Sequence, residues 1–233
     1  MLGKHIDERF GTGRNQIPPY SKGEEIANMV THICGAAFAV FALFACIIKA
    51  SLNHNILGII TAFIYGISMI VVYVISSIYH GLDTDDAFLG KVVMRTIDHC
   101  DIYGLIVGTF TPIVLDGIRR VNPVMAWVSF GIVLLTAAVG ITFTAINFEK
   151  FSAVSYSAYF ICGWSVIITV KDMFLVYRLE FIILLLIGGL VYTLSMIFYV
   201  LEDKGVKYAH SIFHVFILAG SIVQFIPIFK YCF

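Results

Sequence analysis

Seven long apolar stretches are the feature that most limits how this chain can fold. Each is about 20 residues long, the length an α-helix needs to cross the hydrocarbon core of a bilayer. Hydrophobic residues make up 60% of the 233 residues and charged residues 13%. A water-soluble globule of this size could not bury so much apolar surface. In chain order the stretches are Ala27–Ile48, Ile56–His80, Val93–Leu115, Pro123–Phe143, Phe151–Val170, Phe181–Val200 and Tyr208–Phe229.

The sequence therefore predicts an all-α membrane protein with seven transmembrane helices. A β-barrel is excluded, because barrel strands alternate in hydrophobicity over about ten residues. We expect an N-terminal tail over residues 1–26, a helical domain over 27–229 and a C-terminal tail over 230–233. The tail has no apolar segment typical of a cleaved signal peptide. Ser21 and Glu24 form the pattern of a capping box just before the first stretch.

The flanking charges predict the orientation of the chain. Nine of the 15 Lys and Arg residues lie on the side of the N-terminal tail and six on the other side. Because cytoplasmic loops are enriched in Lys and Arg, we expect a cytoplasmic N-terminus, an outside C-terminus and a location in the cell (plasma) membrane. The net charge of zero gives no electrostatic basis for binding nucleic acid. The five cysteines lie mostly in apolar stretches and are interpreted as small hydrophobic residues, not as disulfides.

Ionisable residues inside the predicted helices gather at one membrane face. His80 ends the second stretch, Asp98 lies near the start of the third, and His210 and His214 lie near the start of the seventh. Even-numbered helices end, and odd-numbered helices begin, on the side of the N-terminal tail. All four residues are therefore expected at that face, and ionisable groups within a membrane mark functional sites by default.

Their spacing indicates a metal site. His210 and His214 are four residues apart, so both rings lie on one face of a helix. Three imidazoles and a water form a common open zinc site. We predict His80, His210 and His214 as zinc ligands. Asp98 would act as general base or orient an imidazole, and Ser76, one turn before His80, would assist by hydrogen bonding.

Other interpretations of the same residues stay open at this point. Histidines near helix ends often lie at the lipid–water boundary with a satisfied hydrogen bond. Asp98 and Asp101 could form a proton relay of the kind found in transporters. Glu24, Asn28 and His32 are four residues apart and could form a hydrogen-bonded stripe, although helix capping and solvation explain Glu24 and the neighbouring Glu25 about as well.

These residues also resemble a known family, the bacterial hemolysin III proteins, which are the prokaryotic branch of the progestin and adiponectin receptor family. The resemblance extends from about Tyr20 to Phe229. It implies seven helices with a cytoplasmic N-terminus, zinc bound by the three histidines, a zinc-bound water held by Asp98, and Ser76 beside the site. The matching segments are Glu24–Asn28 with Thr31–His32, Ser76–His80, Asp98–His99, Gly108–Pro112 and His210–Phe216.

The resemblance implies a metal-dependent hydrolase acting on a lipid amide or ester, as in ceramidases, or a lipid-homeostasis factor. The expected partner is a membrane lipid or an acyl-chain substrate. Two alternatives remain: a non-catalytic, receptor-like sensor with structural zinc, and a cytolysin that kills cells by hemolysis. Cytolysins usually need a soluble form that inserts, and this chain is too apolar for that form. The sequence leaves the oligomeric state open.

Overall fold

The computed structural model describes residues 17–83 and 87–233, and within these ranges the chain forms helices and no strand. Seven helical segments are long and apolar enough to cross a membrane, which confirms the predicted all-α fold. The orientation of the termini stays a prediction. The seven segments are Lys22–Leu52, Ile56–Gly81, Phe88–Arg120, Pro123–Asn147, Ser152–Val176, Leu179–Glu202 and Ala209–Cys232.

Two of the seven segments change helix type along their length. After α4, the chain winds as a π-helix and then as a 3₁₀-helix, and α6 and α7 are joined by a 3₁₀ turn. The elements are α2 (Lys22–Leu52), α3 (Ile56–Gly81), α4 (Phe88–Thr111), η2 (Pro112–Gly117), η3 (Ile118–Arg120), α5 (Pro123–Asn147), α6 (Ser152–Trp164), η4 (Ser165–Thr169), α7 (Val170–Val176), α8 (Leu179–Asp203) and α9 (Ala209–Cys232).

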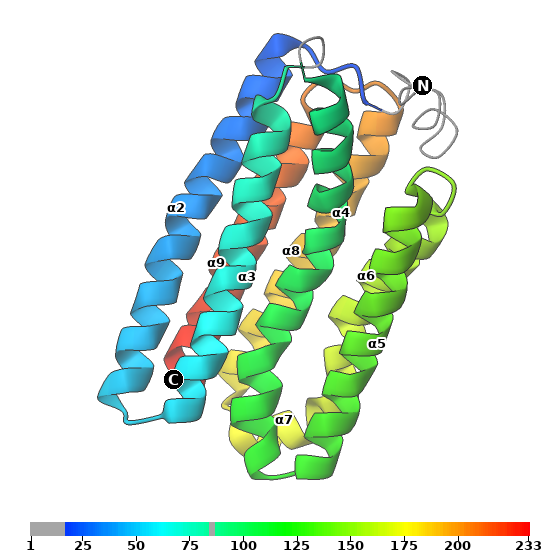
Figure 1. The fold of residues 1–233 in the computed structure, drawn as a ribbon. Coiled ribbons are helices and arrows are strands. Elements are labelled where there is room, and N and C mark those ends of the chain that lie inside the picture. Colours follow the sequence, from blue (N-terminus) through cyan, green and yellow to red (C-terminus); the bar gives the residue numbers. More distant parts are fainter. Residues whose placement is uncertain (1–16, 84–86) are drawn as a thin grey trace.

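The helices run roughly along one axis and form a bundle (Figure 1). Helix α2 packs against α3 and α9, α4 packs against α3 and α5, and α8 packs against α9. At one end of the bundle α2, α4, α6 and α9 begin and α3, α5 and α8 end (Figure 1). We call this the histidine end, because the predicted ligands lie there. The far end carries the C-terminus.

The predicted first helix begins too late. Helix α2 begins at Lys22, five residues before the predicted Ala27, because Ser21 caps it in a full capping box with Glu24. Capping satisfies backbone N–H groups that the first turn leaves without partners. At the other terminus, α9 continues to Cys232, so the predicted tail over 230–233 is mostly helix. Residues 1–16 of the predicted N-terminal tail lie outside the described residues.

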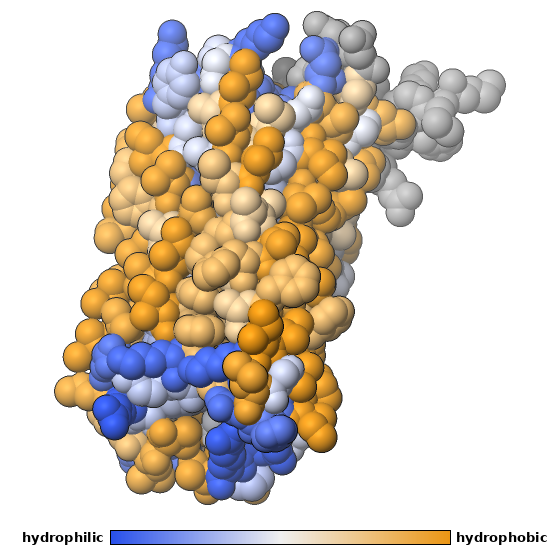
Figure 2. All heavy atoms as spheres, turned by 90° about the vertical axis from the view of Figure 1, so that its left-hand side faces the viewer, coloured by the Kyte–Doolittle hydropathy of each residue, from blue (hydrophilic) through white to orange (hydrophobic). Residues whose placement is uncertain are grey.

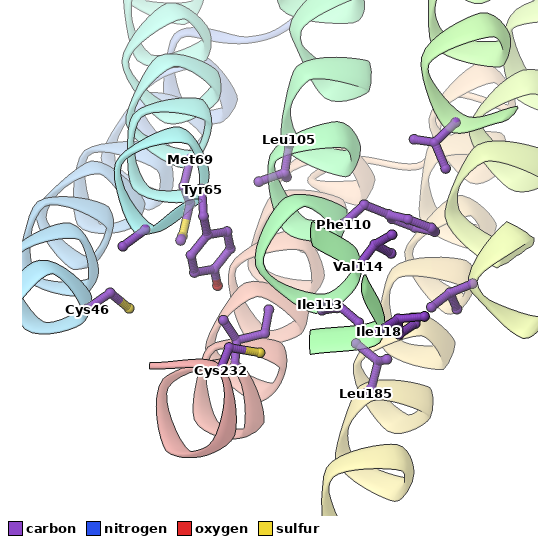
Figure 3. Packing of buried hydrophobic residues seen from close by; sticks show 14 of the residues in the cluster. Cys46, Tyr65, Met69, Leu105, Phe110, Ile113, Val114, Ile118, Leu185 and Cys232 are labelled. Atoms are coloured by element: carbon purple, nitrogen blue, oxygen red, sulfur yellow. The ribbon is translucent and has the colours of Figure 1, made fainter. Parts of the chain in front are cut away.

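Close packing of α3 and α4 depends on one of two glycines, Gly104 and Gly108, that lie four residues apart in α4. A Cβ atom on Gly108 would lie 1.9 Å from Ser68 Oγ of α3, whereas one on Gly104 would meet no other described atom within 4 Å. Below this contact, Phe110, Ile113, Val114 and other apolar side chains fill the centre of the bundle (Figure 3). All five cysteines are free, as predicted.

The outer surface matches a bilayer. Large apolar side chains are exposed along every spanning segment, for example Phe41, Phe63 and Leu135 at 62%, 55% and 68%. In the view of Figure 2 apolar residues form a broad band, with hydrophilic residues gathered near its two ends. The chain is thus a multi-pass membrane protein, and the polar residues inside the bundle stand out against this background.

Candidate metal centre

Three imidazoles from two helices meet at the histidine end. His80 lies in the last turn of α3, and His210 and His214 lie in the first turns of α9. One potential ligand atom from each ring lies within 4.8 Å of the others. The ring centroids are 5.1 Å apart for His80 and His210, 5.0 Å for His80 and His214, and 4.4 Å for His210 and His214. The structure therefore brings together the three predicted ligands.

Each ring directs its Nδ1 atom at an oxygen atom. His80 Nδ1 lies 2.6 Å from Glu25 Oε2 of α2, and His210 Nδ1 lies 2.6 Å from Glu202 Oε2 of α8. His214 Nδ1 lies 3.2 Å from the carbonyl oxygen of Asn28. Because these oxygens accept hydrogen bonds, Nδ1 carries the ring proton and donates it. The lone pair of each neutral ring is then on Nε2.

The Nε2 atoms fit a bound cation. Those of His80 and His210 are buried and have no hydrogen-bond partner among the described residues. Buried polar atoms are nearly always paired, so two such atoms facing one cluster need an explanation. Neutral imidazoles whose other nitrogen donates to a carboxylate or carbonyl are the usual protein ligands of zinc. The donor set fits such a metal.

Asp98 and Ser76 lie beside the imidazoles but outside the three-histidine cluster. Both line the same cavity as His210 and His214. Ser76 Oγ is buried and faces the carboxylate of Asp98. Their positions allow contact with a molecule in the cavity, and their roles stay predictions.

This cavity has a volume of about 370 Å³ and runs from the cluster into the bundle. Apart from the residues at the cluster, its walls are largely apolar side chains of α4, α6, α8 and α9, among them Ile106, Phe110, Phe160 and Leu186. Leu105, Phe110, Ile113 and Leu185 of its lining are labelled in Figure 3. A space of this size and character suits a hydrocarbon chain. The cluster thus lies at the polar end of an apolar pocket.

Comparison with known proteins identifies the family. The sequence pattern of the family described as haemolysin-III related matches residues 20–225. The chain belongs to this family. It is 32% identical to a protein named Hemolysin-3 from Bacillus cereus, over 89% of this chain and 91% of that protein. No solved structure matches the chain significantly.

Two further relatives are also similar along most of their length. A Bacillus subtilis (strain 168) protein named Hemolysin-3 homolog is 32% identical over 90% of this chain and 94% of its own length. A human protein named monocyte to macrophage differentiation factor is 27% identical over 89% of this chain and 84% of its own length. Similarity therefore covers the whole bundle and not a single motif.

Two carboxylates that contact the ligand rings in this haemolysin-III-related chain were not predicted as site residues. Glu25 was assigned to capping or solvation, yet it binds His80 and also Lys91 Nζ, a side chain only 1% exposed. Glu202 was not considered. It lies in the last turn of α8, where the helix dipole disfavours an acidic residue. An acidic residue in this unfavourable position indicates that its side chain has a partner elsewhere in the fold.

The predicted stripe on α2 is replaced by contacts to other elements. Glu24 binds Ser21 and the backbone N–H of Tyr208. Asn28 accepts a hydrogen bond from Ser211 at 2.5 Å, and its Nδ2 lies 3.4 Å from His80 Nδ1. His32 stacks on His214, with ring centroids 3.6 Å apart. These side chains position the start of α9 against α2.

The proton relay through Asp98 and Asp101 stays a prediction. Both carboxylate oxygens of Asp101 are buried and have no hydrogen-bond partner in residues 17–83 and 87–233. His99 lies outside the cluster. Its Nδ1 binds the carbonyl oxygen of Arg95 and its Nε2 binds the hydroxyl of Tyr199.

Proposed function

We propose that this haemolysin-III-related protein is a zinc-dependent hydrolase of membrane lipids that cleaves an amide or ester of a fatty acid. The observation that carries the proposal is the placement of three buried imidazoles, oriented by two carboxylates and a carbonyl, at the polar end of an apolar cavity. A single acyl chain would occupy the cavity, and its carbonyl group would lie at the cluster.

In this proposal His80, His210 and His214 hold zinc, which supplies a Lewis acid and an activated water when it is bound. Asp98 would accept a proton from the water whose oxygen bonds to the carbonyl carbon. It would pass that proton to the amine nitrogen or alcohol oxygen that leaves as the amide or ester bond breaks. Ser76 donates a hydrogen bond to the carbonyl oxygen as negative charge develops there. The apolar walls exclude other water and so strengthen both interactions.

Metal analysis of the purified protein tests the ligand set. We expect about one zinc per chain in the wild type and loss of most of it in His210→Ala and His214→Ala, because two imidazoles hold zinc far more weakly than three. His54→Asn is the matched control, since His54 lies in the turn at the far end of the bundle. Equal zinc in all four proteins would overturn the ligand assignment.

A second comparison separates catalysis from a structural role of the metal. A fluorogenic long-chain acyl amide and the matching ester serve as probes. Asp98→Asn should keep its zinc and lose turnover, because an amide cannot accept the proton. Undiminished turnover in Asp98→Asn would refute the role of Asp98. Absence of turnover in a zinc-loaded wild type would favour a receptor-like sensor with structural zinc.

A further inference from the structure

The segment just before α2 lies across the histidine end. Tyr20 places its ring 5.7 Å from the ring of His80 and 5.3 Å from that of His210, measured between centroids. Its hydroxyl donates a hydrogen bond to Glu202 Oε1, and Glu202 Oε2 accepts from His210 Nδ1. Ile17 is 6% exposed, so the segment is held by burial as well as by this bond.

Local sequence makes this segment stiff. Pro18 and Pro19 each have a φ angle fixed by the ring, and the N–H of Tyr20 donates to the carbonyl oxygen of Pro18 at 2.9 Å. Such a three-residue turn suits proline at its centre. Ser21 follows at once as the N-cap of α2. Little conformational entropy is therefore lost when Tyr20 is placed over the imidazoles.

The cluster needs a cover because it lies close to the ends of its helices. His80 is the last residue but one of α3, and His210 is the second residue of α9. Residues this near a helix end lie within about 3 Å of it along the axis, where water reaches them. Nevertheless His80 is 3% exposed and His210 is 7% exposed. The ring of Tyr20 lies against both side chains.

We infer that Tyr20 is a positioning residue that closes the aqueous side of the imidazole cluster and holds Glu202 against His210. The hydrogen bond from the Tyr20 hydroxyl to Glu202, here called the latch, holds the segment in place. The aromatic ring of Tyr20, here called the cover, shields the imidazoles from water. A closed aqueous side leaves the apolar cavity as the way in for a substrate. The part of this inference that concerns zinc rests on the proposed function. The part that concerns access does not.

The first experiment measures zinc release from the purified wild type to excess EDTA. Tyr20→Phe keeps the ring and loses the latch, and we expect release about tenfold faster, the factor typical for loss of a hydrogen bond to a charged group. Tyr20→Ala should release zinc at least as fast as Tyr20→Phe. Tyr208→Phe is the control, since Tyr208 lies at the same end with its hydroxyl near Gly23. Zinc release at the wild-type rate in Tyr20→Phe would refute the role of the hydroxyl. Release at the wild-type rate in Tyr20→Ala would refute the role of the ring.

A second experiment needs no metal. Ser76→Cys places a thiol in the cavity wall, in a protein that also carries Cys34→Ala and Cys100→Ala. In EDTA-treated protein, a negatively charged methanethiosulfonate reagent should modify this thiol slowly when Tyr20 is present and about tenfold faster with Tyr20→Ala. Tyr208→Ala should leave the rate unchanged. Equal rates of thiol modification with and without Tyr20 would overturn the inference, whether or not the protein binds zinc. Faster modification in Tyr20→Ala would support it even in a protein that binds no zinc.

Discussion

Glu202 gives the sharpest test of how the cluster is built. Its carboxylate accepts a hydrogen bond from His210 Nδ1 at 2.6 Å, and the two side chains are 12% and 8% exposed. Glu202→Gln keeps an oxygen acceptor and removes the charge. Hydrogen bonds to charged groups contribute about 1.5–3 kcal/mol and neutral ones about 0.5–1.5 kcal/mol. The midpoints of these ranges differ by about 1.2 kcal/mol, which corresponds to roughly eightfold weaker zinc binding.

The assay is a zinc titration of detergent-solubilised protein in competition with a chelating fluorophore. Glu202→Ala removes the acceptor as well, so its affinity should fall by about a hundredfold, the upper range for partners of metal-bound histidines. Glu180→Gln is the matched control, because Glu180 forms an exposed pair with Lys230. Equal zinc affinities for Glu202→Gln and Glu180→Gln would refute the argument that Glu202 orients His210.

Three further predictions concern packing, the cavity and the second carboxylate. Gly140→Ala should lower the free energy of unfolding by about 1–3 kcal/mol, because the added Cβ would lie 2.2 Å from the Tyr103 ring. Gly131→Ala on the same helix is the control, since its Cβ would meet no described atom within 4 Å and should leave stability unchanged. Thermal unfolding in detergent measures both. Gly163 lines the cavity, so the larger side chain in Gly163→Phe should reduce lipid turnover without loss of zinc. Gly131→Phe is the control and should leave turnover unchanged. Lys91→Met leaves Glu25 without its cation and should lower stability by about 3 kcal/mol, and an unchanged melting temperature would show that the pair contributes nothing.

The helices were predictable because each one requires an apolar stretch long enough to cross the bilayer, and such a stretch is visible locally in the sequence. Where the helices end was less predictable. The start of α2 follows from the Ser21 capping box, but the 3₁₀ turn at Ser165–Thr169 has no proline or glycine within it to indicate it. Pro112 did indicate the change of helix type after α4, because it removes a backbone donor.

The convergence of the histidines was predictable for a topological reason. Odd and even helices alternate in direction, so the ends of α3 and the starts of α4 and α9 must share a face. Which helices are neighbours within that face is a tertiary property. The contact between Glu202 of α8 and His210 of α9, and the position of Tyr20 over both rings, depend on packing that no local pattern encodes.

The charges around the cluster give a separate argument for a cation. Glu25 is paired with the buried Lys91, so these two charges balance. Glu202, Asp98 and Asp101 have no lysine or arginine partner among the ion pairs of residues 17–83 and 87–233. Arg95 acts on Glu202 and Asp98 only from a distance, because it is bound to Glu149. Isolated buried charges are costly inside a membrane. A divalent ion held by the three neutral imidazoles would offset negative charge from these carboxylates, which is the charge that the proposed zinc would bring.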